Sequence, residues 1–260
     1  MSAKYSRWQT ASILEALKVR RVVMLAGARQ CGKTTLVKQL DHTAIYRTLD
    51  NQVLLDAAKT DPMGFIQHGN ELMIVDEIQR APILLPAIKM NVDENTAYGR
   101  FLITGSAKIQ SLPTVNESLA GRIRKIRLRT LTQGEINNAA PRFLQQAFTE
   151  EFNNNYTTVS KDDCINYALV GGYPEAVFLN NLADAKQWYL DYVQSLLERD
   201  LKDIINIRRT DSIKKLLYVL AAWSSKYMDF AAIGSGLALS RPTIQSYINA
   251  LEGLYLVEKI

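Results

Sequence analysis

Residues that form covalent cross-links or soft metal centres are scarce in this sequence. The 260 residues include only two cysteines, Cys31 and Cys164, and two histidines, His42 and His68. Two cysteines argue against a disulfide framework, and the two histidines have no spacing typical of metal ligands. We therefore expect a protein of the reducing cytoplasm that has no zinc-type site.

Long apolar runs are also missing. None approaches the roughly 20 residues that span a bilayer, and residues 1–8 lack the apolar core of a signal peptide. With 47% hydrophobic and 22% charged residues, the composition is that of an ordinary globular chain. These features predict one large or two small domains and no membrane partner.

The excess of positive charge is small, +5 over the whole chain. Much of it lies within eight residues, at Arg122, Arg124, Lys125, Arg127 and Arg129. A cluster of this kind is compatible with a polyanionic partner, and it is equally typical of a solvated strand edge.

Residues 27–35 match G-x-x-x-x-G-K-[ST], the pattern of a phosphate-binding loop. An apolar run at 22–26 precedes it and residues 34–40 have helical spacing, so the motif lies between a strand and a helix. We expect the loop amides to bind nucleotide phosphates, Lys33 to contact the outer phosphates and Thr34 to ligate Mg²⁺. The predicted nucleotide-binding residues are Gly27, Ala28, Arg29, Gln30, Cys31, Gly32, Lys33, Thr34 and Thr35.

A second motif follows at residues 71–79, where four apolar residues run into Asp76 and Glu77. This is the pattern called Walker B, and it is informative because a phosphate-binding loop precedes it. We expect Asp76 to bind Mg²⁺ through its water shell and Glu77 to polarise the water that attacks the γ-phosphate.

The strand predicted at 100–106 ends in small polar residues. If it lies beside the Walker B strand, Thr104 or Ser106 would reach the attacking water or the γ-phosphate. Ordinary turn chemistry is the alternative for both residues. The repeated strand–helix order predicts an α/β fold, a P-loop NTPase three-layer sandwich with a parallel sheet, over residues 1–135.

The rest of the chain is predicted to be helical. We expect an all-α lid over residues 136–205 and a winged helix-turn-helix over 206–260, with helices at 213–223, 230–237 and 241–251 and a wing strand starting at Tyr255. Ser240 suits an N-cap and Pro242 a first helical turn. Because the chain stops within the expected wing strand, we expect it to be part of a longer protein. Arg241, Thr243 and Gln245 are candidates for contacts with double-stranded DNA, and a plain packing module is the alternative.

These motifs together resemble a group of prokaryotic AAA+-superfamily ATPases that have a C-terminal winged helix followed by a nuclease-like domain of unknown function. The resemblance covers nearly the whole chain. It depends on residues 27–36, 75–79, 104–106, 119–122, 171–175, 199–201 and 243–248. It implies an ATP-binding core, a helical lid and a winged helix, but leaves the cellular role undefined.

Two carry-overs from this resemblance, Arg122 and Arg29, have alternatives, and Cys31 departs from the family pattern. Arg122 falls on the Gly-Arg of the family pattern and would act as an arginine finger toward a neighbour or as a sensor in its own chain, unless it only belongs to the basic strand. Arg29 is either a phosphate-side or a surface arginine. Cys31 replaces a small apolar residue, and we expect its thiol, beside an anion-binding helix end, to have a lowered pKa.

We therefore expect a protein that hydrolyses Mg·ATP to drive or gate a conformational change in a protein or nucleic-acid partner. A homo-oligomer is compatible with a finger in trans. The alternatives are a nucleotide-gated switch with little turnover and a DNA-binding regulator that the phosphate loop controls.

Overall fold

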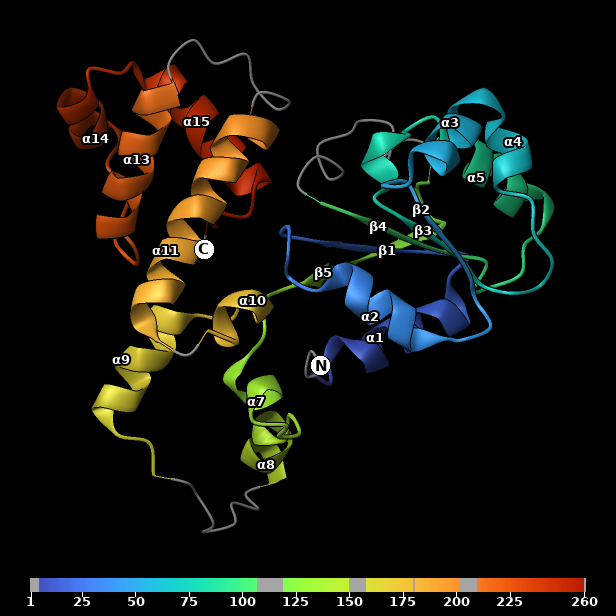
Figure 1. The fold of residues 1–260 in the computed structure, drawn as a ribbon, viewed down its shortest axis with the longest axis horizontal. Helices are drawn as coiled ribbons and strands as arrows, with labels where there is room; N and C mark the ends of the chain where they lie inside the picture. Colours follow the sequence, from blue (N-terminus) through green and yellow to red (C-terminus); the bar gives the residue numbers. More distant parts are fainter. Residues whose placement is uncertain (1–4, 107–118, 150–157, 180, 202–209, 260) are drawn as a thin grey trace.

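The computed structural model describes residues 5–106, 119–149, 158–179, 181–201 and 210–259. An α/β unit comes first and a set of helices follows (Figure 1). None of the helices in these ranges is long and apolar enough to cross a membrane.

The α/β unit contains a sheet of five parallel strands in the order β2-β3-β4-β1-β5. The strands are β1 (Val22–Gly27), β2 (Ile45–Thr48), β3 (Met73–Asp76), β4 (Phe101–Gly105) and β5 (Ile123–Leu128). Pairing of β4 with both β1 and β3 places the strand that carries Thr104 beside the Walker B strand, which is the condition for the expected role of Thr104 or Ser106. The carboxyl ends of β1, β3 and β4 therefore meet at one edge of the sheet.

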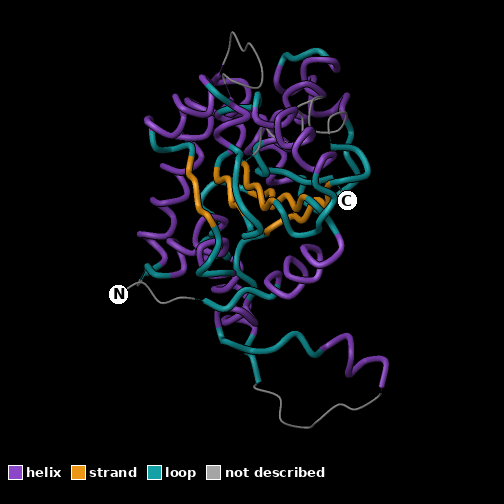
Figure 2. The backbone as a smooth tube through the Cα atoms, turned by 90° about the vertical axis from the view of Figure 1, so that its right-hand side faces the viewer, coloured by secondary structure: helices purple, strands orange, loops and turns teal. Residues whose placement is uncertain are grey.

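Helices cover both faces of this sheet, which confirms the predicted three-layer α/β arrangement (Figures 1 and 2). One face packs against α1 (Gln9–Val19) and α2 (Lys33–Leu40), and the other against α3 (Gln52–Thr60), α4 (Pro62–Phe65) and α5 (Leu84–Glu94). Side chains alternate between the faces along each strand. In β1, Val22 and Met24 face α3–α5, whereas Val23 and Leu25 face α1 and α2.

After β5 the chain is helical. A long helix, α11 (Leu182–Ser195), continues directly into a π-helix, η3 (Leu196–Asp200). Between β5 and position 202, the described residues also form α7 (Gln133–Ile136), α8 (Phe143–Thr149), α9 (Lys161–Val170) and α10 (Pro174–Val177). The predicted lid is therefore helical where it is described. Its boundary at 135/136 stays a prediction, and the one at 205/206 lies outside the described residues.

The last helices form a second apolar core, which also includes Leu197 and Leu201. They are α13 (Thr210–Ala222), α14 (Phe230–Leu237) and α15 (Arg241–Gly253), close to the predicted bounds. The Ser240 hydroxyl accepts a hydrogen bond from the Thr243 amide at 3.3 Å, which confirms the predicted N-cap. A three-residue turn joins α14 and α15 in helix-turn-helix order.

The predicted wing strand is wrong for residues 255–259, because the chain leaves α15 through a turn and forms no strand there. Tyr255 has a positive φ of 60° and turns the segment back onto the edge strand β5. Its ring lies under Arg127, with the guanidinium carbon 5.0 Å from the ring centroid. Glu258 accepts hydrogen bonds from Arg127 at 2.6 Å and from Arg129 at 2.7 Å. The segment therefore contacts β5 through side chains and not through strand pairing. The Glu258 carboxylate neutralises part of the basic cluster of the same chain.

Candidate functional site

The phosphate-binding loop connects β1 to α2 at the carboxyl edge of the sheet. Its curvature requires left-handed backbone at Gln30 (φ 58°) and Gly32 (φ 98°). Gly27 has no room for a side chain, because a Cβ would collide with the carbonyl oxygen of Leu128. Lys33 is buried, and its Nζ donates to the carbonyls of Gly27 at 3.1 Å and Ala28 at 2.8 Å. The sequence thus folds into a loop that closes around its own lysine.

Asp76 is the last residue of β3, and its carboxylate lies beside the first turn of α2. Its Oδ2 accepts hydrogen bonds from the Thr34 hydroxyl at 2.8 Å and from the Tyr46 hydroxyl at 2.7 Å, and its Oδ1 accepts one from Thr104. Burial, and then the bond to Asp76, raises the pKa of Tyr46, so this tyrosine stays a donor. The two residues predicted to bind Mg²⁺, Thr34 and Asp76, are therefore in contact.

Glu77 follows directly in a left-handed conformation (φ 61°), which is uncommon for a residue with a side chain. Its amide donates to the Thr104 hydroxyl at 3.1 Å, and its carboxylate accepts a hydrogen bond from Gln79. Gln79 also donates to the Ser106 hydroxyl at 3.0 Å. Thr104 is fully enclosed beneath the carboxylates, whereas Ser106 lines a cavity, so the two candidate sensors lie at different depths.

Two cavities adjoin these residues. One, of about 300 Å³, is lined by Gly32–Leu36 and by side chains that include Tyr5, Leu131 and Phe178. The rings of Tyr5 and Phe178 are stacked, with centroids 5.4 Å apart. The other, of about 830 Å³, lies between the carboxyl edge of the sheet and α11–η3, and Glu77 lines both.

Arg29 lies on the lid side of the loop. Its guanidinium pairs with Asp200 of η3 at 2.6 Å, and its carbonyl accepts a hydrogen bond from Tyr192 of α11 at 3.1 Å. Of the two positions that the sequence allowed, the structure has the surface one, paired with the helical part. The pair lies in the wall of the larger cavity, beside Arg199 of η3.

The expected lowering of the Cys31 pKa is wrong. The side chain is fully buried, and its thiol donates to the Leu128 carbonyl, with the sulfur 3.6 Å from the oxygen. Burial raises the pKa, because it disfavours the thiolate more than nearby Lys33 and Arg7 favour it.

Arg122 lies far from the loop of its own chain. It precedes β5, which runs parallel to β1, so it lies at the amino edge of the sheet, about 20 Å along the strands from the loop. There its Nη2 donates to Asp93 Oδ2 at 3.0 Å. The structure therefore does not bring Arg122 to this site as a sensor in cis, and a role toward a second copy stays a prediction.

The three candidate DNA-contacting residues follow one another on α15. Arg241 is exposed and lies over the Phe230 ring at 5.6 Å, and Gln245 donates to Asn249 at 2.9 Å. Thr243 is half-buried and takes part in the N-cap with Ser240. Gln245 is half-buried as well, so Arg241 is the exposed member of the three.

Sequence reasoning missed Tyr46 and assigned no role to Gln79. Tyr46 lies on β2, whose end pairs with the end of β3. The available signal was a phenol on the strand that precedes Walker B, but only the strand order shows that it reaches Asp76.

A phosphate-binding loop, a paired hydroxyl and carboxylate, and a following glutamate at one edge of a parallel sheet are the features of a P-loop ATPase. In agreement, residues 19–137 match the family model of the AAA domain (AAA_14), and residues 161–260 match a domain of unknown function (DUF8612). The AAA match together with the fold supports a P-loop ATPase domain of the AAA type over residues 19–137.

The chain is also similar to curated proteins and to solved structures. An uncharacterized protein of Mycobacterium tuberculosis is 28% identical over 251 residues, which cover 96% of this chain and 52% of that protein. One of Methanocaldococcus jannaschii is 22% identical over 275 residues, 93% of this chain and 57% of that protein. The chain thus spans about half the length of these curated relatives. The solved structure of a Walker-type ATPase of Pyrococcus abyssi has the same fold, with a TM-score of 0.58 and 14% identity over 96% of this chain and 90% of that one.

Proposed function

We propose that this chain hydrolyses Mg·ATP and uses the reaction to drive or gate a conformational change in a partner. One observation carries the proposal: the Thr34 hydroxyl and the Asp76 carboxylate are hydrogen-bonded at 2.8 Å, beside Lys33 and directly before Glu77. Thr34 and Asp76 are 42 positions apart in the sequence. Their contact at a phosphate-binding loop supports the proposal that both residues bind one metal ion.

The smaller cavity suits a nucleotide. The loop amides and Lys33 would bind the phosphates at one end, since the amino end of a helix favours anions. The apolar end, with the stacked rings of Tyr5 and Phe178, would receive the base. The nucleotide would therefore lie across the N-terminal segment, the loop and α10.

The residues at this site fit Mg²⁺. A hydroxyl and a carboxylate supply the oxygen ligands that it prefers, and it is usually held by one or two carboxylates together with substrate phosphates. Such a site does not require a cluster of three or more His, Cys, Asp or Glu side chains, and the described residues contain no such cluster. When bound, the ion would neutralise charge on the phosphates.

Glu77 is the proposed general base. Its backbone is held by Thr104 and its carboxylate by Gln79. Because Glu77 lines both cavities, it lies where a water molecule from the larger cavity would meet the end of a phosphate chain in the smaller one. Release of the Gln79 hydrogen bond would free the carboxylate to accept a proton from that water.

The helical part is the proposed moving element. It contacts the loop through the pair Arg29–Asp200 and the bond from Tyr192 to the Arg29 carbonyl. A change in the loop on nucleotide binding would therefore shift α11 and η3 directly. Because η3 packs against the C-terminal helices, the shift would reach them as well.

Phosphate release from Mg·ATP tests this function, comparing the natural chain with Glu77→Gln at several protein concentrations. We expect turnover that the substitution abolishes while nucleotide still binds, and a rise of specific activity with concentration if a finger acts in trans. Equal turnover in both proteins would refute Glu77 as the base. Binding without turnover in either would favour the switch, and no binding would refute the nucleotide site itself.

Contact with DNA through α15 is a second candidate function. It is supported by two helices, α14 and α15, that a three-residue turn joins, and by Arg241, which is exposed on the second of them. Titration of duplex DNA at two salt concentrations tests it. Affinity should fall with salt and with Arg241→Ala, and equal affinity in Arg241→Ala would count against contact through α15.

A further inference from the structure

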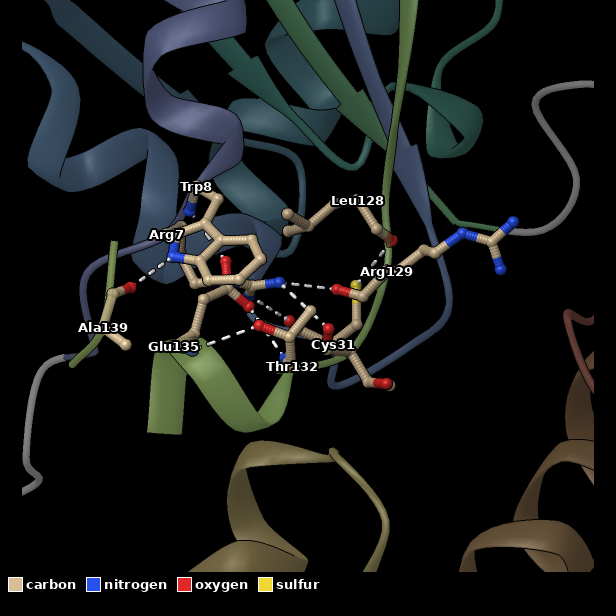
Figure 3. A network of polar contacts seen from close by, with 9 residues as sticks. Arg7, Trp8, Cys31, Leu128, Arg129, Thr132, Glu135 and Ala139 are labelled. Carbon is tan, nitrogen blue, oxygen red and sulfur yellow. Dashed lines mark hydrogen bonds and ion pairs between the residues drawn. The ribbon is translucent and has the colours of Figure 1, made fainter. Parts of the chain in front are cut away.

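A buried ion pair joins the N-terminal segment to the chain that follows β5 (Figure 3). The Nε of Arg7 lies 3.1 Å from Oε1 of Glu135, and the two side chains are only 6% and 1% exposed. Burying a charged pair is costly, so the site must supply further hydrogen bonds to both partners. Both partners have them here.

Arg7 uses its remaining nitrogens to bind backbone carbonyls from two separate segments. Nη1 donates to the carbonyl of Cys31 in the phosphate-binding loop at 2.9 Å, and Nη2 donates to the carbonyl of Arg129 after β5 at 2.6 Å (Figure 3). One planar guanidinium therefore links the loop, the exit of β5 and the start of α7. A lysine could not reproduce these fixed directions, since its ammonium is a point donor.

The bond to Cys31 determines the direction of the next amide. The peptide between Cys31 and Gly32 is trans, so the carbonyl and the Gly32 N–H lie in one plane and point in opposite directions. Gly32 has no Cβ and a φ of 98°, so side-chain sterics do not fix the orientation of this peptide plane and another contact has to hold it. Arg7 holds the carbonyl, and the N–H is thereby directed away from Arg7.

We propose that Arg7 is a positioning residue that aims the Gly32 amide at the nucleotide phosphates, and that Glu135 keeps Arg7 in place. This inference rests on the proposed nucleotide-binding function. Gly32 and Arg7 both line the smaller cavity. Fixing the amide before the ligand arrives removes the need to order it on binding.

Glu135 suits the second role because its contacts are all with donors. Oε1 accepts from Arg7 and from the Trp8 amide at 2.7 Å, and Oε2 accepts from the Thr132 amide at 2.9 Å (Figure 3). A glutamine there would have to turn its own N–H₂ toward at least one donor. Glu135→Gln should therefore loosen Arg7 while keeping the size of the side chain.

Positioning and simple charge attraction predict opposite results for that variant. Glu135→Gln removes a negative charge near the phosphates, so attraction alone would tighten phosphate binding. Loosening of Arg7 would weaken it. Arg7→Lys keeps the charge but loses the fork, so positioning predicts weaker binding and attraction predicts no change.

The experiment measures the dissociation constants of Mg·ADP and of tripolyphosphate, which has no base, for the natural chain, Arg7→Lys and Glu135→Gln. We expect both ligands to bind about tenfold more weakly to Arg7→Lys, since a hydrogen bond to a charged donor is lost. Glu135→Gln should also weaken the binding of both ligands. The matched control is Arg21→Lys, because Arg21 is half-buried and also donates to a carbonyl, that of Val92 at 3.1 Å, at the opposite edge of the sheet.

The outcomes distinguish failure of the positioning role of Arg7 from failure of the proposed nucleotide site. Thermal unfolding of every variant shows whether it is folded at the binding temperature, and Glu135→Gln carries the test if Arg7→Lys does not fold. Natural affinity in Arg7→Lys, or tighter binding in Glu135→Gln, overturns the positioning role. Weaker binding of ADP with unchanged tripolyphosphate also overturns it, because the effect would then act through the base. Absence of binding by the natural chain refutes the nucleotide site instead.

Discussion

Replacement of Thr104 by valine would show how strongly β4 holds the acidic end of β3. The Thr104 side chain is fully buried, and its hydroxyl donates to Asp76 and accepts from the Glu77 amide. Valine has nearly the same shape without a hydroxyl. Loss of a bond to a charged acceptor costs about 1.5–3 kcal/mol, and a donor left unpaired costs about 1–3 kcal/mol. Because one hydroxyl supplies both bonds, we expect a total near 3 kcal/mol.

Urea unfolding and thermal unfolding measure this loss. For a chain of this size, about 3 kcal/mol corresponds to a fall of roughly 6–12 °C in the melting temperature. The matched control is Thr104→Ser, which keeps the hydroxyl and loses one methyl group, worth about 1 kcal/mol. Phosphate release should fall in the valine variant and be retained in the serine variant. A valine variant as stable as the serine variant would refute the argument that this hydroxyl holds the site.

Two further predictions concern the cysteines and the C-terminal segment. A thiol reagent should modify exposed Cys164 in the native protein and spare Cys31, whose pKa burial raises, until denaturant is added; native modification of both at one rate would contradict this. Hydrogen bonds from Arg129 and then Arg127 lower the pKa of Glu258 below 4.5, so its pairs should stabilise the fold above that pH and cease to do so as pH falls through the lowered pKa. The difference in urea midpoint between the natural chain and Glu258→Gln should therefore be present at pH 7 and disappear in acid, and a difference that grows in acid would contradict it.

Local patterns were sufficient to predict the sheet and the position of the loop. The apolar runs of β1, β3 and β4 are buried on both faces, and such strands read as continuous hydrophobic segments in the sequence. The glycine spacing of the loop and the cap at Ser240 are also local, since each depends on a few neighbouring residues. By itself, therefore, the sequence determined the α/β class, the strand and helix limits near the site, and the pairing of a phosphate loop with a Walker B carboxylate.

Tertiary structure decided everything that depends on distant segments. Tyr46 reaches Asp76 only because β2 lies beside β3, and Arg122 is kept from the loop only because β5 runs parallel to β1. The prediction of a wing strand was wrong because it also depended on contacts with a distant segment. An extended segment needs a partner, and residues 255–259 meet Arg127 and Arg129 instead.

The charge environments show the same division. Next to a helix end, Cys31 reads as an activated thiol, but desolvation raises its pKa, and burial depends on which helices cover the loop. Arg7 and Glu135 are 128 positions apart, and nothing in the local sequence of either indicates a buried pair. Periodicity and motif spacing are properties of neighbouring residues, whereas burial and ion pairing are properties of the folded chain, and for that reason only the fold showed them.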